Sequence, residues 1–288
     1  MRTQGRPTVL KGRGRRALAV AAAALALFAS VAAPAQPKAR ASALAVSPAE
    51  QAQLQEVARR GALLYAYDQA AWHGTDEMVA KLPAYQDRVG GWIVDGPADA
   101  PELIFFDKEG VRPVYTARFR GGRPISGEVA AAGAGELSAA RRQLIAARNA
   151  AAEVLAASDS RGCSEGGAMN SVVLPPAAPG EPTLVYLLTP QRVMDTFPFG
   201  GHFLIPVDSL GRAGAIRRFT NSCLEISTTG ASKEKRLVSF GVTHLLDRLP
   251  TEIHVFTSLA ARLPVAVGTS DGRTWWVDGT AIRLIGKD

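Results

Sequence analysis

GWIVDGPADAPELIFFDKEGVRPVYTARF, residues 91–119, holds three short apolar runs separated by residues that favour turns. The runs GWIVD, ELIFFD and VRPVYTARF are rich in β-branched and aromatic side chains, which favour strands. Lys108-Glu109-Gly110 is a turn signal between the last two. Strands joined by such short connections pair in antiparallel order, so this stretch predicts an antiparallel sheet.

A helix is predicted before this sheet. Ser47-Pro48-Ala49-Glu50 combines a capping serine, a proline in the first turn and a glutamate three residues after the serine, which is the pattern of a helix start. Helical spacing of apolar residues continues from there towards Trp72. His73-Gly74 is expected to end the helix, with a shorter helix in TDEMVAKLP, residues 75–83.

A second helix is predicted after the sheet, at about residues 138–157 and starting at Ser138. Its apolar side chains face a core. The opposite side carries Arg141, Arg142 and Arg148, which are expected to form a solvated face and not a binding patch.

Beyond residue 158 the chain is expected to be almost entirely β. Strands are predicted in SVVLP, TLVYLLTP, HFLIPVD, AIRRFTNSCLEI, RLVSFGVTHLL, TEIHVFTSL, LPVAVGTSD and RTWWVDGTAIRLI. The turns at residues 208–211 and 270–272 are expected to be hairpin connections.

No Gly-x-Gly-x-x-Gly or P-loop motif occurs, so a nucleotide-dependent role has no support.

Neighbouring strands beside segregated helices predict an α+β fold with an antiparallel sheet, and not alternating βαβ units. We expect N-terminal helices and a long mid-chain helix packed on a mainly antiparallel β-sheet, with a β-rich C-terminal half. Residues 47–288 are expected to form a single domain, with a helix and hairpin lobe at 47–157 and a β-rich lobe at 158–288.

Residues 1–35 have the composition of an export signal. A basic head precedes an apolar run at residues 17–32, and Ala33-Pro34-Ala35 offers a cleavage site. The run has about 16 residues, fewer than the roughly 20 that span a bilayer, so an uncleaved anchor is the less favoured alternative. Residues 36–46 are then a Pro/Ala-rich tether, and the protein is expected to be periplasmic or secreted.

The formal charge of +7 is mostly a property of this segment, which has six basic residues and no acid. The remaining chain is close to neutral and has no long-range field to attract nucleic acid or anionic lipid. Later apolar runs are too short to cross a membrane. We therefore expect neither nucleic-acid binding nor an integral membrane segment after cleavage.

The only two cysteines, Cys163 and Cys223, predict a disulfide in an oxidising compartment. The alternatives are two separate buried thiols, or a nucleophile at Cys163 in its glycine-rich loop.

Hydrolase signatures are weak. Gly-x-Ser-x-Gly is absent, and Ser232-Lys233-Glu234-Lys235 fits Ser-x-x-Lys within a polar connection that is expected to be a loop.

Three of the four histidines, His202, His244 and His254, fall in the β-rich half. With Glu252 they are the ingredients of a catalytic zinc site, in which the histidines are ligands and the glutamate is a general base or fourth ligand. Their spacing matches none of the short helical zinc motifs, so the ligands would have to converge from separate strands.

The register of the predicted 251–259 strand decides which of these groups meet. Alternation places Glu252 and His254 on one face. A four-residue loop at 247–250 leaves His244 on the opposite face, whereas a three- or five-residue loop gathers all three groups. The favoured reading has Glu252 and His254 hydrogen-bonded at a surface or shallow groove.

Other polar and aromatic residues have structural interpretations. His73 is expected in a turn or cap, and not in catalysis with Asp76 or Glu77. Gly200-Gly201 before His202 fits a bulge at a strand start, or a close approach of a ligand to the backbone. Four aromatic residues are expected to be core or to line a groove: Tyr65, Tyr67, Trp72 and Trp92.

These observations favour a non-catalytic, exported, disulfide-tied α+β domain that binds an envelope partner or a small ligand, without a cofactor. The alternative is a zinc-dependent hydrolase that uses His202, His244, His254 and Glu252.

Overall fold

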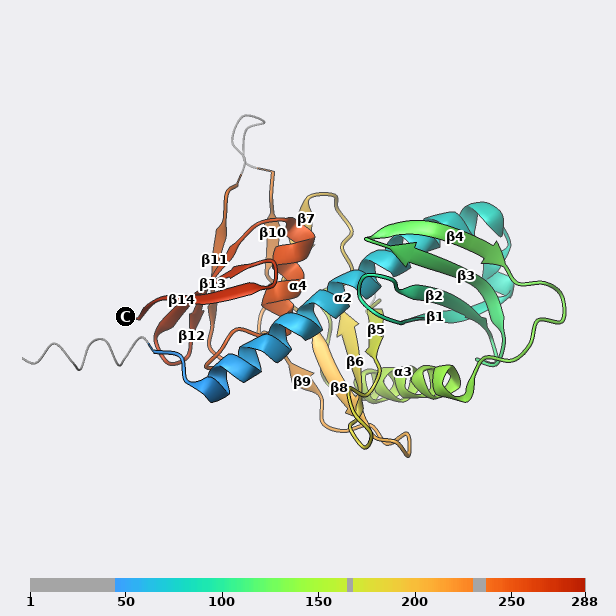
Figure 1. Cartoon of the computed structure of the whole chain (residues 1–288), viewed down its shortest axis with the longest axis horizontal. Coiled ribbons are helices and arrows are strands. Elements are labelled where there is room, and N and C mark those ends of the chain that lie inside the picture. The colour runs from blue at the N-terminus through green and yellow to red at the C-terminus, as the bar shows by residue number, and fades with distance from the viewer. Residues whose placement is uncertain (1–44, 165–167, 230–236, 288) are drawn as a thin grey trace, which may run out of the picture. The chain divides into compact units, whose positions relative to one another are not determined.

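The computed structural model describes residues 45–164, 168–229 and 237–287 (Figure 1). The predicted export segment, nearly all of the tether and the Ser232–Lys235 motif lie outside the described residues. The described part is a mixed α+β fold with a β-rich C-terminal half, as predicted. Within that part, no helix combines the length and the apolar character needed to cross a bilayer.

Helix α2, Pro48–Lys81, is 34 residues long and begins as predicted. The Ser47 hydroxyl accepts a hydrogen bond from the Glu50 N–H, and the Glu50 carboxylate accepts one from the Ser47 N–H, which completes a capping box. The predicted break at His73-Gly74 is wrong, because the helix continues through it. Gly74 lacks a side chain where Leu103 packs against the helix, so this glycine permits a close contact and does not end the helix.

The opening stretch forms the predicted antiparallel sheet. Its strands are β1 (Val89–Asp95), β2 (Glu102–Asp107), β3 (Pro113–Arg120) and β4 (Arg123–Val129), in the order β1-β2-β3-β4. Helix α3, Ala139–Ala157, starts after its predicted cap Ser138, whose hydroxyl accepts from the Arg141 N–H.

The prediction that three arginines of α3 form a solvated face is wrong for two of them. Arg141 forms ion pairs with Asp95 and Glu102 on the first sheet, and Arg148 is half-buried over the rings of Trp92 and Phe106. Arg142 is paired with Glu136 nearer the surface. Arginine can bury its apolar stem against a neighbouring surface, and here the heads find carboxylates or aromatic rings on the first sheet, which composition alone does not indicate.

A second antiparallel sheet has the order β5-β6-β8-β9. Its strands are β5 (Asn170–Leu174), β6 (Thr183–Leu188), β8 (Phe203–Val207) and β9 (Arg217–Arg218). Successive side chains of a strand point to opposite faces of the sheet, so alternate residues pack into two different cores. Val172 and Leu174 join a cluster with α2 and the first sheet, whereas Val173 joins a cluster with α3.

A short ribbon pairs β7, Thr196–Pro198, with β10, Glu225–Ser227. Cys163 and Cys223 form the predicted disulfide across 60 positions of sequence. Gly201 has a positive φ of 73°, and a Cβ atom there would lie 2.5 Å from the Cys163 sulfur. Glycine is therefore required at this position by both the backbone conformation and the adjoining bridge.

The C-terminal part contains β11 (Phe240–His244), α4 (Glu252–Ala261), β12 (Val265–Thr269), β13 (Arg273–Asp278) and β14 (Ala281–Lys287). Strands β11 and β12 are parallel and are joined through α4, whereas the other pairs of this sheet are antiparallel. Among the described residues, this parallel crossover is a local departure from sheets that are otherwise antiparallel, as predicted.

The predicted strand at residues 251–259 is also wrong, because this segment is helix α4. Thr251 is the N-cap, and its N–H donates to Nδ1 of His254, so an imidazole occupies the position that glutamate takes in a capping box. Almost every side chain of α4 is buried. A helix enclosed on all sides has no polar face, so its β-branched residues resemble a buried strand.

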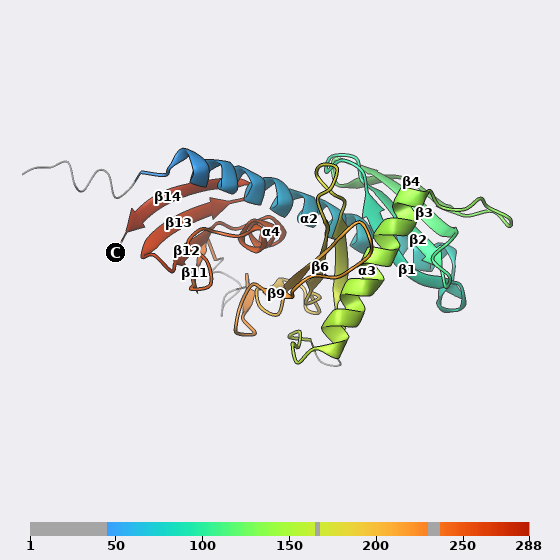
Figure 2. The same ribbon diagram turned by 90° about the horizontal axis from the view of Figure 1, so that it is seen from below.

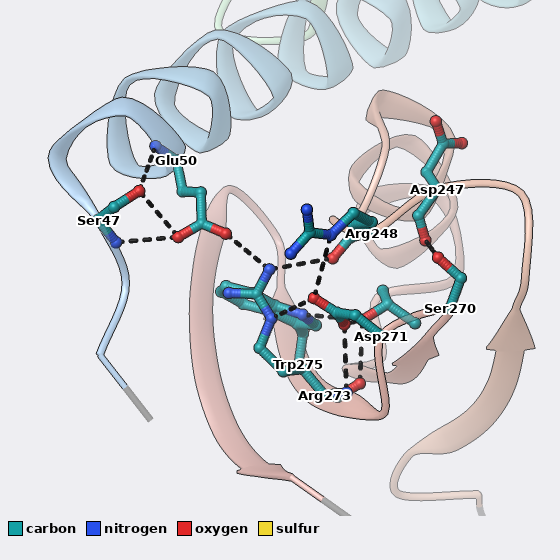
Figure 3. Close-up of polar contacts among 9 residues, drawn as sticks. Ser47, Glu50, Asp247, Arg248, Ser270, Asp271, Arg273 and Trp275 are labelled. Carbon is teal, nitrogen blue, oxygen red and sulfur yellow. Dashed lines mark hydrogen bonds and ion pairs between the residues drawn. The ribbon is translucent and has the colours of Figure 1, made fainter. Parts of the chain in front are cut away.

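The N-terminus of α2 is tied to the C-terminal sheet through Arg273 (Figure 3). Its guanidinium donates to Glu50 and Asp271 at 2.7 Å each, and lies 4.9 Å from the Trp275 ring. Hydrogen bonds from Ser47 and then from Arg273 lower the pKa of Glu50 to about 2. The capping glutamate therefore serves the helix end and the ion pair together.

Helices α2 and α4 lie side by side (Figures 1 and 2), and Gly61 of α2 is in close contact with α4. A Cβ atom at Gly61 would lie 2.5 Å from Cγ1 of the fully buried Val255 and 2.9 Å from the Glu252 carbonyl oxygen. Atoms of real side chains do not approach this closely, so the present spacing of the two helices requires glycine at position 61.

We expect Gly61→Ala to lower the free energy of unfolding by about 1–3 kcal/mol, because the added methyl group must push α4 away. This runs against the usual gain of up to about 1 kcal/mol when alanine replaces glycine in a helix. Urea unfolding measures the change. Gly135→Ala is the control, since a Cβ there meets nothing within 4 Å. A stabilised Gly61→Ala protein would contradict the close contact.

Candidate functional site

The predicted site residues lie around α4, but they do not form the predicted constellation. Glu252 is in the first turn of α4, where its carboxylate accepts a 2.7 Å hydrogen bond from the Tyr186 hydroxyl. Both groups are buried. Burial, and then the neighbouring Glu252 charge, raise the pKa of Tyr186 well above its usual range. This hydrogen bond joins α4 to the second sheet.

His202 is held on both ring nitrogens. Nδ1 accepts from the Thr189 N–H at 3.1 Å, and Nε2 lies 3.1 Å from the Pro198 carbonyl oxygen, to which it donates as the neutral tautomer. Burial lowers the pKa of His202 to about 4, so the ring is uncharged near neutral pH. These contacts fix the turn between β6, β7 and β8.

His244 and His254 come together, contrary to the four-residue-loop register that separated them. Their ring centroids are 4.7 Å apart, with an interplanar angle of 87°. His244 also pairs with Asp247 at 2.8 Å, and this bond is the main reason that the pKa of Asp247 is below its ordinary value. Burial, and then the proximity of His244, lower the pKa of His254 to about 3.

The three-histidine metal site is not formed in the part of the chain that the structure describes. No three His, Cys, Asp or Glu side chains there are grouped to hold a metal ion. His202 uses both ring nitrogens within the protein, and His254 uses Nδ1 for the cap of α4. The zinc-hydrolase alternative therefore lacks the donor set on which it depended.

His73, predicted in a turn or cap, instead lies on an exposed part of α2, with its ring stacked against Trp72. Tyr67 is buried in the core, whereas Tyr65, Trp72 and Trp92 line a cavity. The prediction of core or groove positions is thus correct for these four aromatic residues. Their clustering was the sequence signal that pointed to the cavity.

This cavity has a volume of about 1220 Å³. Its wall is formed by the middle of α2, the start of β1, the adjoining ends of β5 and β6, strand β7 and the C-terminal end of α4. Aromatic side chains contribute much of the lining, including Tyr65, Trp72, Trp92, Phe105, Phe197 and Phe256.

Polar and charged side chains form much of the remaining wall. Asp68 lies on the α2 wall near Asn170 of β5, and Arg148 reaches the wall from α3. Thr257 lies on the α4 wall with 1% of its surface exposed, and its buried hydroxyl has no hydrogen-bond partner in the described structure. Concave sites that combine aromatic side chains with convergent polar groups are typical of small-molecule binding.

Asp68 is the carboxyl group that the cavity perturbs most clearly. Burial raises its pKa from 3.8 to about 6, even though hydrogen bonds from Gln69 and Asn170 act in the opposite direction. Perturbed ionisable groups in a cavity are common at functional sites. No role for Asp68 was predicted; the sequence signal that could have found it is an acid at the helical spacing of the apolar residues of α2.

Known proteins offer no guide to this site. No protein-family model, curated protein or solved structure matches the chain. The function must therefore be inferred from the cavity itself.

We expect Asp68→Asn to stabilise the protein at pH 7.5. The folded-state pKa is raised, so the folded protein holds a proton that the unfolded chain releases, and stability falls as pH rises from about 4 to about 6. One pKa unit corresponds to about 1.4 kcal/mol, and for this partly exposed group we expect a gain of about 1–2 kcal/mol at pH 7.5.

Urea unfolding at pH 4 and pH 7.5 checks this, with the exposed Asp76→Asn on the same helix as control. The gain in free energy of unfolding should be smaller at pH 4, because Asp68 there is closer to the same degree of protonation in the folded and the unfolded protein. An equal gain at both pH values would show that desolvation of Asp68 is not its cause.

Proposed function

We propose that the protein is a binding protein that holds a small organic ligand in the cavity lined by α2, β1, β5, β6, β7 and α4. The observation that carries this proposal is the cavity of about 1220 Å³, whose wall combines aromatic rings with many polar side chains. Ligand sites commonly have about 300–1,000 Å³ and combine apolar with polar lining groups, and this cavity is slightly larger than that range. The ligand is therefore expected to have an apolar or aromatic body with polar substituents.

Binding is favoured over nucleophilic catalysis by the contacts of the wall hydroxyls. Covalent catalysis needs a hydroxyl or thiol next to a base that activates it. Among the described residues of the wall, hydroxyls contact backbone carbonyls, other side chains or nothing, and none is hydrogen-bonded to an imidazole. His73 lies on the wall, but its ring stacks on Trp72.

Fluorescence titration with N-phenyl-1-naphthylamine, a neutral aromatic probe, tests this proposal. We expect saturable binding with about one site and a rise in probe emission, because the dye leaves water for an aromatic cavity. Excitation of Trp72 and Trp92 should transfer energy to the bound dye.

Ala260→Phe should weaken probe binding by at least about tenfold, which is about 1.4 kcal/mol. Ala260 lies on the α4 wall, so the added ring occupies ligand space. Ala146→Phe, on the exposed side of α3, is the matched control and should leave binding unchanged. Equal affinity in both variants would place the dye outside the cavity and contradict the proposal.

We further propose that the protein works in the periplasm or outside the cell, where it meets its ligand or an envelope partner. The disulfide between Cys163 and Cys223 supports this, because such bonds persist in oxidising compartments. The basic, apolar and small-residue order of residues 1–35 supports it independently.

Expression of the whole chain in a bacterial host tests export. We expect a periplasmic protein that begins at Gln36 by mass spectrometry and has no free thiol. Deletion of residues 17–32 should leave the product in the cytoplasm with two titratable thiols, because the apolar run is what the export machinery recognises. An uncleaved, cytoplasmic product from the complete chain would contradict export.

A further inference from the structure

Arg148 is a half-buried cation on the cavity wall. Its guanidinium carbon lies 5.8 Å from the Trp92 ring centre and 5.9 Å from that of Phe106. Gly91 also lines the cavity, and a Cβ atom there would come within 3.3 Å of this carbon. Strand β1 therefore leaves space at Gly91 for the guanidinium to reach the wall.

The protein provides Arg148 with neutral partners only. Nε donates to the Ser171 hydroxyl and Nη1 to the Asn149 side-chain oxygen, each at 2.9 Å. Over the described residues, Nη2 has no acceptor and no carboxylate pairs with this arginine. Asp68, on the same wall, is bonded to Gln69 and Asn170 instead.

Arg141, two turns earlier on α3, is a useful comparison because its guanidinium does have charged partners. Its guanidinium donates to the carboxylates of both Asp95 and Glu102. Arg141 is thus neutralised twice, whereas Arg148 is not neutralised at all. Placing a cation away from water without a counter-charge is costly, and burial lowers the pKa of Arg148 accordingly. A bound anion would remove this cost.

We infer that Arg148 is an anion-binding residue and that the ligand of the cavity is an organic acid, whose anionic oxygens accept hydrogen bonds from the free Nη donors while its apolar body lies among the aromatic rings. This inference rests on the proposed ligand-binding function. Guanidinium groups suit this role because they present parallel donors to carboxylate-like groups and remain charged at all ordinary pH values. Stacking on Trp92 and the bond to Ser171 hold the donors in place.

Two probes with the same aromatic skeleton separate this inference from the proposed function. N-phenyl-1-naphthylamine is neutral, and 8-anilino-1-naphthalenesulfonate adds one sulfonate. Both are titrated against the purified, folded protein by calorimetry. We expect the sulfonate to bind more tightly, because a hydrogen bond to a charged group adds to the contacts that both dyes share.

Arg148→Gln should weaken binding of the sulfonate by about 10-fold to 100-fold, the range expected for loss of a charged hydrogen bond. Binding of the neutral dye should change by less than about twofold, which also reports that the cavity remains intact. Arg148→Lys should retain part of the preference for the anion. Arg142→Gln, on the same helix, is the matched control and should alter neither affinity.

The outcomes are distinguishable. Equal affinity of both dyes for the unmodified protein, or an equal loss of both in Arg148→Gln, would overturn the anion site and leave the ligand-binding cavity supported by the neutral dye. Failure of both dyes to bind the unmodified protein would overturn the proposed function, and the anion site with it.

Discussion

The close contact of α2 and α4 at Gly61 is the constraint on which the rest of this structure depends. Val255 and the Glu252 carbonyl oxygen occupy the space that any side chain at position 61 would need. This contact fixes α4 against the middle of α2. On one side of it, the start of α4 places Glu252 against Tyr186 and His254 against His244. On the other, the end of α4 forms part of the cavity wall, to which α2 also contributes.

The cavity is assembled from segments that are far apart in the sequence, which explains why its elements could be predicted better than the site itself. The capping box at Ser47, the cap at Ser138 and the apolar runs separated by turn residues in the opening sheet are local patterns, and all three formed as expected. The aromatic cluster on α2 was also recognised as core or groove. Its partner walls on β7 and α4 depend on tertiary packing, for which the sequence has no local signal.

Helix α4 was the main error, and its cause is physical. Binary patterning distinguishes helix from strand only when one side faces water. Every residue from Glu252 to Ser258 is buried, so no such contrast exists. The remaining signal was a threonine followed three residues later by a histidine, a capping pair in which imidazole replaces carboxylate. The strand register that was to decide the histidine site therefore concerned a strand that does not exist, and the two histidines meet through a helix end instead.

Whether a buried or half-buried charged side chain has an oppositely charged partner distinguishes its structural or functional role in this fold. Arg273 joins α2 to the C-terminal sheet through Glu50, and Arg141 joins α3 to the first sheet through Asp95 and Glu102. In both cases a charged group finds an opposite charge on another element. Asp68 and Arg148 are partly withdrawn from water as well, yet each has only neutral partners among the described residues. Both lie on the wall of the same cavity. A fold that neutralises Arg141 and Arg273 gains nothing in stability from leaving Asp68 and Arg148 without an opposite charge. Their position is explained if the compensating groups belong to a ligand.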